Sequence, residues 1–323
     1  MTWLYVTLGV IFGLILLCLI TSLVCFFIVF YSPKRKTLGP DEYEIPPGKI
    51  YEPYRDYMIS WAKKARAMPH EDITITSYDG LTLFGRYVEQ TKGAPIEILF
   101  HGYRGYVERD LSGAIDRCFS IGRNALIVDQ RASGKSEGNV ITFGAKEKYD
   151  CVAWANYVAQ RFGPEQEIIL CGVSMGGATV TMASSMELPE NVVCTLADCP
   201  YSTASGIIKK IIKDLKLPVW LLFPFVQLGA LLFGGFKLED ASPLEAVKNC
   251  KVPIIFIHGD NDDFIPHQMS DELYEACPTL KKIVKIEGAG HGLAFPTNKE
   301  KYYGALLDFE KQWRAYKEQK NAT

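Results

Sequence analysis

Residues 167–178 read Glu-Ile-Ile-Leu-Cys-Gly-Val-Ser-Met-Gly-Gly-Ala, and this stretch decides how the rest of the chain is interpreted. An apolar run, Ile168 to Cys171, leads into Gly172-Val173-Ser174-Met175-Gly176, and small residues follow. This is the G-x-S-x-G layout of a nucleophile elbow, a sharp turn between a buried strand and a helix. Glycines two residues before and after the serine leave room for strand and helix to approach closely. The stretch therefore predicts a strand–turn–helix unit with Ser174 as candidate nucleophile.

A serine hydroxyl needs a base that takes its proton and an acid that orients that base. His291 is the candidate base, because it lies in a glycine-rich loop, residues 287–292, directly after an apolar run. The alternative for His291 is an ordinary surface loop histidine. His101 and His258 end predicted strands and are expected to hydrogen-bond locally, and His267 is a weaker candidate.

Asp262 is the candidate acid, since it follows an apolar strand, three residues after Gly259 and four before Pro266. Its neighbours Asp260 and Asp263 fit ordinary loop-capping carboxylates. Asp198, at the end of the preceding predicted strand, is a second candidate for the acid. The chain order serine, aspartate, histidine is a workable order for a catalytic triad.

Two backbone amides are the candidate donors to an oxyanion formed on acyl attack. One is the N–H of Met175, immediately after the serine. The other is the N–H of Tyr103 in the loop after the first predicted parallel strand, His101-Gly102-Tyr103-Arg104-Gly105. Arg104 has two interpretations, contact with an acidic group of a substrate or simple exposure to solvent.

Short apolar runs alternate with helical patterns, which predicts a mostly parallel sheet flanked by helices, an α/β fold. A hairpin is expected first, over residues 73–77 and 81–88, with a turn at Asp79-Gly80. Helices are expected over residues 51–68, 143–161 and 302–320. The expected strands that follow the hairpin are Ile96–Phe100, Ala125–Val128, Ile168–Cys171, Val192–Leu196, Val252–Ile257 and Ile283–Ile286.

Composition excludes several classes of function. The 35 basic and 37 acidic residues nearly balance, so nucleic acid is not an expected partner. Nine scattered cysteines form no C-x-x-C pair and favour a reducing compartment. Metal-ligand spacing is lacking, and Gly134-Lys135-Ser136 fails as a phosphate loop because Asp129 stands where glycine is required. The expectation is a protein without metal or cofactor; the oligomeric state is left open.

The N-terminus is interpreted as an uncleaved transmembrane anchor, residues 1–31, rather than a signal peptide. The segment from Met1 to Pro33 carries no charged side chain and is long enough to cross a hydrocarbon core of about 30 Å. The first charges, Lys34, Arg35 and Lys36, flank its C-terminal end and favour a cytoplasmic position for the rest of the chain. Residues 32–50, rich in proline, are expected to be a linker, and residues 51–323 the main domain.

One segment, residues 203–246, interrupts the alternation of strands and helices. It contains a charge-free run, residues 217–236, whose length permits a second membrane span. A crossing there would separate the strand at Val252 from the sheet that holds Ser174, and prolines and paired glycines weaken it further. We therefore expect an apolar helical insertion that caps a substrate cleft.

These features resemble the α/β-hydrolase superfamily over residues 72–317, and most closely its serine-aminopeptidase-like and monoglyceride-lipase-like members with an N-terminal anchor. The resemblance implies hydrolysis through an acyl-enzyme without metal or cofactor, and a structural role for the loop Asp129–Ser136. The chain departs from esterases that carry an H-G-G-G oxyanion loop, because Tyr103 and Arg104 replace two glycines. Esters of large tertiary alcohols are therefore not expected.

The functional prediction is a membrane-anchored serine hydrolase that cleaves a small-molecule ester with an apolar acyl group. Ser174 attacks, His291 moves the proton, Asp262 orients His291, and the N–H groups of Tyr103 and Met175 bind the oxyanion. A peptidase, thioesterase or acyltransferase would use the same residues. From a different class, a non-catalytic membrane-bound binding module remains the rival hypothesis.

Overall fold

The computed structural model describes residues 1–34 and 38–321. In it, the aliphatic and β-branched runs form a central sheet of eight strands in the order β1-β2-β4-β3-β5-β6-β7-β8. β1 pairs antiparallel with β2, and β2 antiparallel with β4, whereas the strands from β3 to β8 run parallel to one another. The predicted hairpin and the mostly parallel sheet are confirmed. The strands are β1 (Glu71–Thr76), β2 (Thr82–Val88), β3 (Ile96–Phe100), β4 (Asn124–Asp129), β5 (Ile168–Val173), β6 (Val192–Asp198), β7 (Ile254–Gly259) and β8 (Lys281–Ile286).

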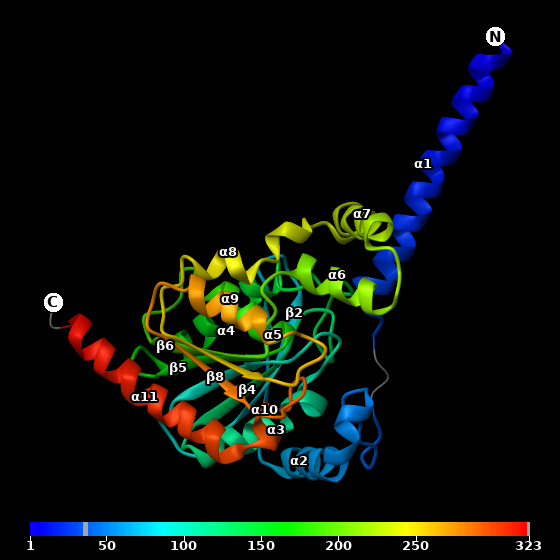
Figure 1. Ribbon diagram of the computed structural model, residues 1–323. Helices are drawn as coiled ribbons and strands as arrows, with labels where there is room; N and C mark the ends of the chain where they lie inside the picture. The colour runs from blue at the N-terminus through cyan, green and yellow to red at the C-terminus, as the bar shows by residue number, and fades with distance from the viewer. Residues whose placement is uncertain (35–37, 322–323) are drawn as a thin grey trace.

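Helices cover both faces of the sheet, and each face has its own buried apolar cluster (Figure 1). One face is covered by α2 (Arg55–Ala67), α3 (Val107–Ser120), α10 (Ala294–Thr297) and α11 (Lys299–Asn321). The other is covered by α4 (Glu147–Phe162), α5 (Met175–Ala183), α8 (Pro243–Val247) and α9 (Gln268–Ala276). The helix predicted from residue 143 begins at Glu147, because Phe143 and Gly144 have φ of 53° and 90°, outside the helical region.

The insertion between β6 and β7 is helical and does not cross a membrane. It contains α6 (Ala204–Asp214), α7 (Val219–Gly229), the single turn η2 (Ala230–Gly234), η3 (Leu238–Asp240) and α8. β6 and β7 are neighbours in the same sheet, so the chain returns to the side from which it left. The argument from topology against a second span is therefore correct.

Among the described residues, one helix is long and apolar enough to cross a membrane, α1 (Thr2–Val29). It projects from the domain over most of its length (Figure 1), and residues 1–20 are exposed. Its last turns are different: Phe26 and Phe30 are buried in a third apolar cluster that also contains Met175. The expectation of a separate N-terminal segment needs correction, since the end of α1 belongs to the core of the domain.

The predicted linker is ordered in part. Ser32 donates its N–H to Asn139 O at 2.8 Å, and a short 3-10 helix, η1 (Lys49–Tyr54), leads directly into α2. Residues 35–37, which include Arg35 and Lys36 of the predicted basic flank, lie outside the described residues.

A buried ion network ties β3 to α3. The Glu97 carboxylate is fully buried and pairs with the guanidinium groups of Arg117, at 2.5 Å, and Arg123. Burial by itself raises the pKa of Glu97, but the two arginines outweigh it and lower the pKa to about 2. The network therefore stabilises the fold fully above the unfolded-state pKa of about 4.3, and this contribution is lost as pH falls from there through about 2.

Glu97→Gln should lower the free energy of unfolding by about 3–5 kcal/mol, because it leaves two guanidinium groups buried with a neutral partner. The measurement is chemical unfolding at neutral pH followed by tryptophan fluorescence. Glu167→Gln is the matched control: it removes a half-exposed pair with Arg314 and should cost about 1 kcal/mol or less. Equal effects of the two substitutions would contradict the account of the network.

Candidate active site

Ser174 occupies the turn between β5 and α5 with φ of 58° and ψ of −117°, a strained conformation for a residue with a side chain. The flanking glycines make the turn possible. A Cβ at Gly172 would come within 2.1 Å of the Gly176 backbone, and one at Gly176 within 2.1 Å of Phe100 O. The local sequence therefore forms the elbow because no larger residue fits at either glycine.

His291 lies between Ser174 and Asp262, although the three residues come from three separate loops. Its Nε2 is 3.0 Å from Ser174 Oγ, and its Nδ1 is 2.7 Å from Asp262 Oδ2. Ser174 follows β5, Asp262 follows β7 and His291 follows β8, so parallel strands bring them to one edge of the sheet. Chemically, this arrangement allows a hydroxyl proton to pass to an imidazole whose ring is held by a carboxylate.

Asp262 is fixed by more than its contact with His291. Its Oδ1 accepts hydrogen bonds from the N–H groups of Phe264, at 2.9 Å, and Ile265, at 2.8 Å. Burial raises the pKa of this carboxyl, but its hydrogen bonds to His258, His291 and the backbone lower it well below the ordinary value. Asp262 therefore remains a carboxylate at neutral pH.

His258 holds the acid from the other side, a role that the sequence analysis did not assign to it. Its Nε2 lies 3.2 Å from Asp262 Oδ2 and 2.9 Å from Ile265 O, and its Nδ1 lies 2.6 Å from Ser270 Oγ. The sequence signal was the spacing of four residues between His258 and Asp262. That spacing allows the loop after β7 to fold back, so that Asp262 reaches His258 at the end of the strand.

Asp198, the second candidate acid, has different partners. Its Oδ2 accepts a hydrogen bond from the Tyr302 hydroxyl at 2.8 Å, and its backbone oxygen accepts the Ser174 N–H at 2.8 Å. Burial raises the pKa of its carboxyl. Of the two candidates, Asp262 contacts the Nδ1 of His291, whereas Asp198 contacts the backbone of the elbow at Ser174.

The loop with the predicted oxyanion donor passes directly beside the serine. A Cβ at Gly102 would lie 3.5 Å from Ser174 Cβ, which places the backbone just before Tyr103 close to the serine. The same loop contacts α1. The Tyr103 hydroxyl donates to Val29 O at 2.7 Å, and Arg104 Nη2 donates to Ile28 O and Tyr31 O, both at 2.9 Å.

The guanidinium of Arg104 therefore donates to backbone carbonyls at the end of α1, a contact that neither interpretation from the sequence included. Carbonyls in the last turn of a helix have no hydrogen-bond donor within the helix. At the end of α1, the side chains of Tyr103 and Arg104 are the donors. The loop beside Ser174 and the end of α1 thus form one connected unit.

Cys199 lies beside the same residues, with its sulfur within 4.8 Å of ligand atoms of Asp262 and His291. Such a set is able in principle to hold a metal ion. Burial raises the pKa of the Cys199 thiol, which keeps the thiol protonated and makes it a poor ligand. A metal ion would also break the hydrogen bond between Asp262 and His291. The donor set does not fit a resident metal.

A cavity of about 800 Å³ opens beside Ser174 and His291. Much of its wall comes from residues 46–61, here called the N-terminal wall, which spans the end of the predicted linker, η1 and α2. Its deeper part reaches Asp198 and Tyr302. The larger apolar and aromatic lining residues include Ile50, Tyr51, Tyr54, Met58, Trp61, Tyr103, Phe264, Leu293 and Phe295.

The predicted cap is wrong in one respect: within the described part of the chain, no residue of the 203–246 insertion lines this cavity. Instead, α7 packs beside α1. An apolar run in the sequence cannot distinguish a segment that faces a substrate from one that faces another apolar surface. The few apolar residues between positions 46 and 61 form too weak a pattern for the sequence to assign them to the cleft.

Met58→Trp should shorten the cavity and lower kcat/KM for long-chain members of the ester class predicted from the sequence by about tenfold or more, with little change for acetyl esters. The measurement is kcat/KM on esters of graded acyl length. Ser60→Trp, on the exposed side of α2, and Trp220→Ala, in the insertion, are the matched controls and should leave chain-length preference unchanged. A change in acyl-chain-length preference with Trp220→Ala would show that the insertion determines this preference.

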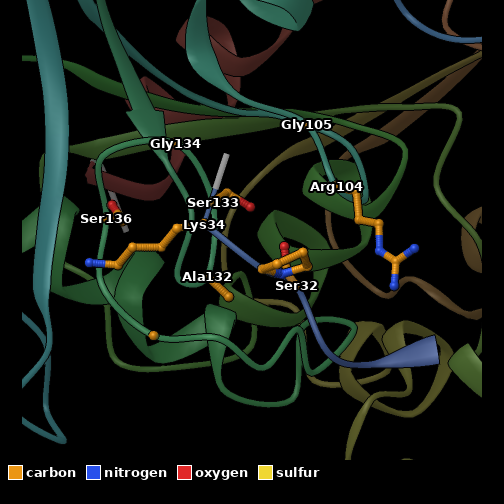
Figure 2. A pocket seen from close by; sticks show the side chains of 10 residues that line it. Ser32, Lys34, Arg104, Gly105, Ala132, Ser133, Gly134 and Ser136 are labelled. Atoms are coloured by element: carbon orange, nitrogen blue, oxygen red, sulfur yellow. The ribbon is translucent and has the colours of Figure 1, made fainter. Parts of the chain in front are cut away.

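A second hollow lies between the chain that leaves α1 and the loops at residues 104–105 and 132–138 (Figure 2). Figure 2 shows the side chains of Lys34 and Arg104 on opposite sides of it. Its volume of about 10 Å³ accommodates no more than a water molecule. The hollow marks where the segment after α1 packs on the domain, and it is too small for a substrate.

Residues 142–316, more than half of the chain, match the prolyl oligopeptidase family. The chain belongs to the prolyl oligopeptidase family. This match includes the elbow and the loops of Asp262 and His291, and it confirms the predicted membership of the α/β-hydrolase superfamily. Family and fold together make the chain a serine hydrolase of that superfamily.

Other proteins are similar to this prolyl oligopeptidase family chain in sequence or in fold. The uncharacterized protein YqkD of Bacillus subtilis is 27% identical over 190 residues, which cover 58% of this chain and 62% of YqkD. The Pyrococcus furiosus esterase Pf2001 superposes with a TM-score of 0.64 at 22% identity, covering 88% of this chain and 99% of the esterase. Est1E from Butyrivibrio proteoclasticus, solved with ferulic acid bound, gives a TM-score of 0.56 at 22% identity, covering 75% of this chain and 99% of Est1E. At these identities the structural likeness establishes the fold.

Proposed function

We propose that this protein is a membrane-anchored esterase that hydrolyses an apolar acyl ester through an acyl-enzyme. The observation that carries the proposal is the chain of contacts Ser174–His291–Asp262, at 3.0 and 2.7 Å, in the wall of a largely apolar cavity. Ser174 Oγ attacks the ester carbonyl while His291 takes its proton, and Asp262 holds His291 in the required tautomer.

The negative charge that develops on the carbonyl oxygen is bound by the N–H groups of Tyr103 and Met175. His291 then gives its proton to the leaving alcohol, and the acyl group stays on Ser174. A water molecule, deprotonated by His291, releases the acid and restores the hydroxyl. Every step uses side chains and amides of this chain, without metal or cofactor.

Three observations favour esters as substrates. Aromatic and aliphatic side chains line the cavity and suit an acyl chain. Solved structures of similar fold include esterases, among them Pf2001. An apolar N-terminal helix keeps the enzyme where apolar esters accumulate.

Peptide-bond hydrolysis is the second candidate, because the family to which the chain belongs is named for a peptidase activity. The test is a panel of esters from acetyl to palmitoyl beside peptide amides, including proline-containing ones. We expect kcat/KM to rise with acyl length through the medium chains and to be far lower for the amides. Efficient cleavage of amides with poor cleavage of esters would replace the proposal.

Anchoring by α1 is part of the proposal. The continuous exposed stretch, residues 1–20, extends about 30 Å at 1.5 Å per residue, which matches a hydrocarbon core. Lys34, directly after it, begins the basic flank that favours a cytoplasmic domain. Reporter fusions at the C-terminus test this orientation, and a mature N-terminus beyond residue 20 would identify a cleaved signal peptide instead.

A further inference from the structure

The insertion exposes large apolar side chains that nothing within the described chain covers. Between residues 213 and 221, all positions except residue 219 are exposed, and Trp220 is 80% exposed. Isolated exposed apolar residues are ordinary, but a contiguous apolar surface marks an interaction site. The exposed large apolar residues are Leu215, Leu217, Trp220, Leu221, Leu231, Leu232 and Phe233.

This surface continues directly from α1. α7 packs against α1 so closely that a Cβ at Gly229 would come within 2.6 Å of Ser22 O, and the Phe233 ring lies tilted beside that of Phe26 with centroids 5.9 Å apart. Small residues at such a contact allow close backbone approach. Figure 1 shows α7 beside the part of α1 nearest the domain.

The depth of this contact follows from the length of α1. Residues 1–20 span about 30 Å and are exposed, and α7 meets the helix at Ser22, directly after them. With α1 across a bilayer, α7 and η2 therefore lie at the level where α1 leaves the hydrocarbon core. Tryptophan is enriched at that level in membrane proteins, and Trp220 is the most exposed large side chain of the insertion.

Charged side chains border this surface at both ends of the apolar run, with Lys237 and Glu239 following it in the chain. Residues 217–236 carry none, whereas α6 and the turn after it carry four lysines within eight residues, Lys209, Lys210, Lys213 and Lys216. Lys210 is paired with Asp214 at 2.5 Å, and Lys209 lies 4.4 Å from the centre of the Phe223 ring. Lys213 and Lys216 are exposed beside the apolar residues.

We propose that α6, α7 and η2 form an interfacial membrane-binding element, which inserts the exposed apolar residues into the leaflet that α1 leaves. Lys213 and Lys216 then lie among the headgroups and favour anionic phospholipids. The inference rests on the proposed anchoring by α1. A lipid occupant, rather than a protein, fits the charge-free run, its continuity with α1 and the lysines along its edge.

The experiment uses the full-length protein reconstituted in vesicles of phosphatidylcholine and phosphatidylglycerol. Some vesicles contain lipid brominated in the upper half of the acyl chain, which quenches nearby tryptophan, and iodide reports exposure to water. Comparing wild type with Trp220→Phe isolates the emission of Trp220. Trp3→Phe isolates a residue of the anchor, and Trp313→Phe, deep in the core, is the matched control.

We expect Trp220 emission to be quenched at least about twofold by the brominated lipid and to be protected from iodide. Quenching of Trp3 without quenching of Trp220 would overturn this inference and leave the anchor in place, whereas quenching of neither would overturn both. Protection of Trp220 from both quenchers would indicate a protein contact, such as a second copy, and would also contradict it.

The lysines are tested in the same assay. The double variant Lys213→Glu, Lys216→Glu should weaken the quenching of Trp220 in vesicles with phosphatidylglycerol and have a smaller effect in phosphatidylcholine alone. An equal effect in both vesicle types would contradict the preference for anionic headgroups.

Discussion

Ser174→Ala should lower kcat on the best ester of the panel by a factor on the order of 10⁶ and abolish labelling by a fluorophosphonate probe. The hydroxyl lies 3.0 Å from His291 Nε2, which is placed to take its proton. The substitution is small, so the free energy of unfolding should change little. Labelling of intact protein and kcat on the panel are the measurements.

Ser133→Ala is the matched control for this substitution. Ser133 is also buried, but its hydroxyl has no hydrogen-bond partner among the described residues and lies outside the large cavity. Its variant should label and turn over like the wild type. A wild-type protein that the probe does not label, or a Ser174→Ala variant that labels undiminished, would favour the rival hypothesis of a binding module.

Asp262→Asn should lower kcat by roughly 10⁴-fold while leaving the fold intact. Oδ1 of Asp262 accepts two backbone N–H groups, so the amide oxygen of asparagine must take that position and the amide nitrogen must face His291. The amide then donates to Nδ1, which forces the ring proton onto Nε2. In that tautomer His291 is unable to accept the proton of Ser174.

Asp198→Asn is the matched comparison, because Asp198 is equally buried and also lies at the end of a strand beneath Ser174. Its amide oxygen can still accept the hydrogen bond from Tyr302, so kcat should fall less than about tenfold. Steady-state kinetics of both variants decide between them. A large loss with Asp198→Asn and a small one with Asp262→Asn would move the acid to Asp198.

Much of the fold was predictable because its signals are local. Apolar runs of four to six residues, separated by helical patterns, gave the parallel sheet. The elbow was predictable from five consecutive residues, since Gly172 and Gly176 are required by contacts within the same turn and with the neighbouring strand β3. The chain order of Ser174, Asp262 and His291 indicated which strand ends should meet.

The features that the sequence did not reveal depend on contacts between distant segments. The wall of the cavity at Met58 and Trp61 is defined by packing on α3, where Gly113 lies against the Trp61 ring. The role of His258 depends on how one loop returns to β7. The hydrogen bonds of Arg104 join residues more than 70 positions apart, and a single arginine in a sequence carries no sign of such a partner.

The bonds from Tyr103 and Arg104 to the end of α1 bear on how the enzyme can be truncated or fused. Deleting residues 1–31 removes the carbonyls of Ile28, Val29 and Tyr31 from the loop beside Ser174, and exposes the apolar surface that Phe26 and Phe30 cover. A transplanted helix from another protein would restore the carbonyls, because every helix backbone has them, but not the rings of Phe26 and Phe30. Removing the proposed anchor would therefore alter the loop beside Ser174, whereas detergent extraction of the intact chain would preserve these contacts.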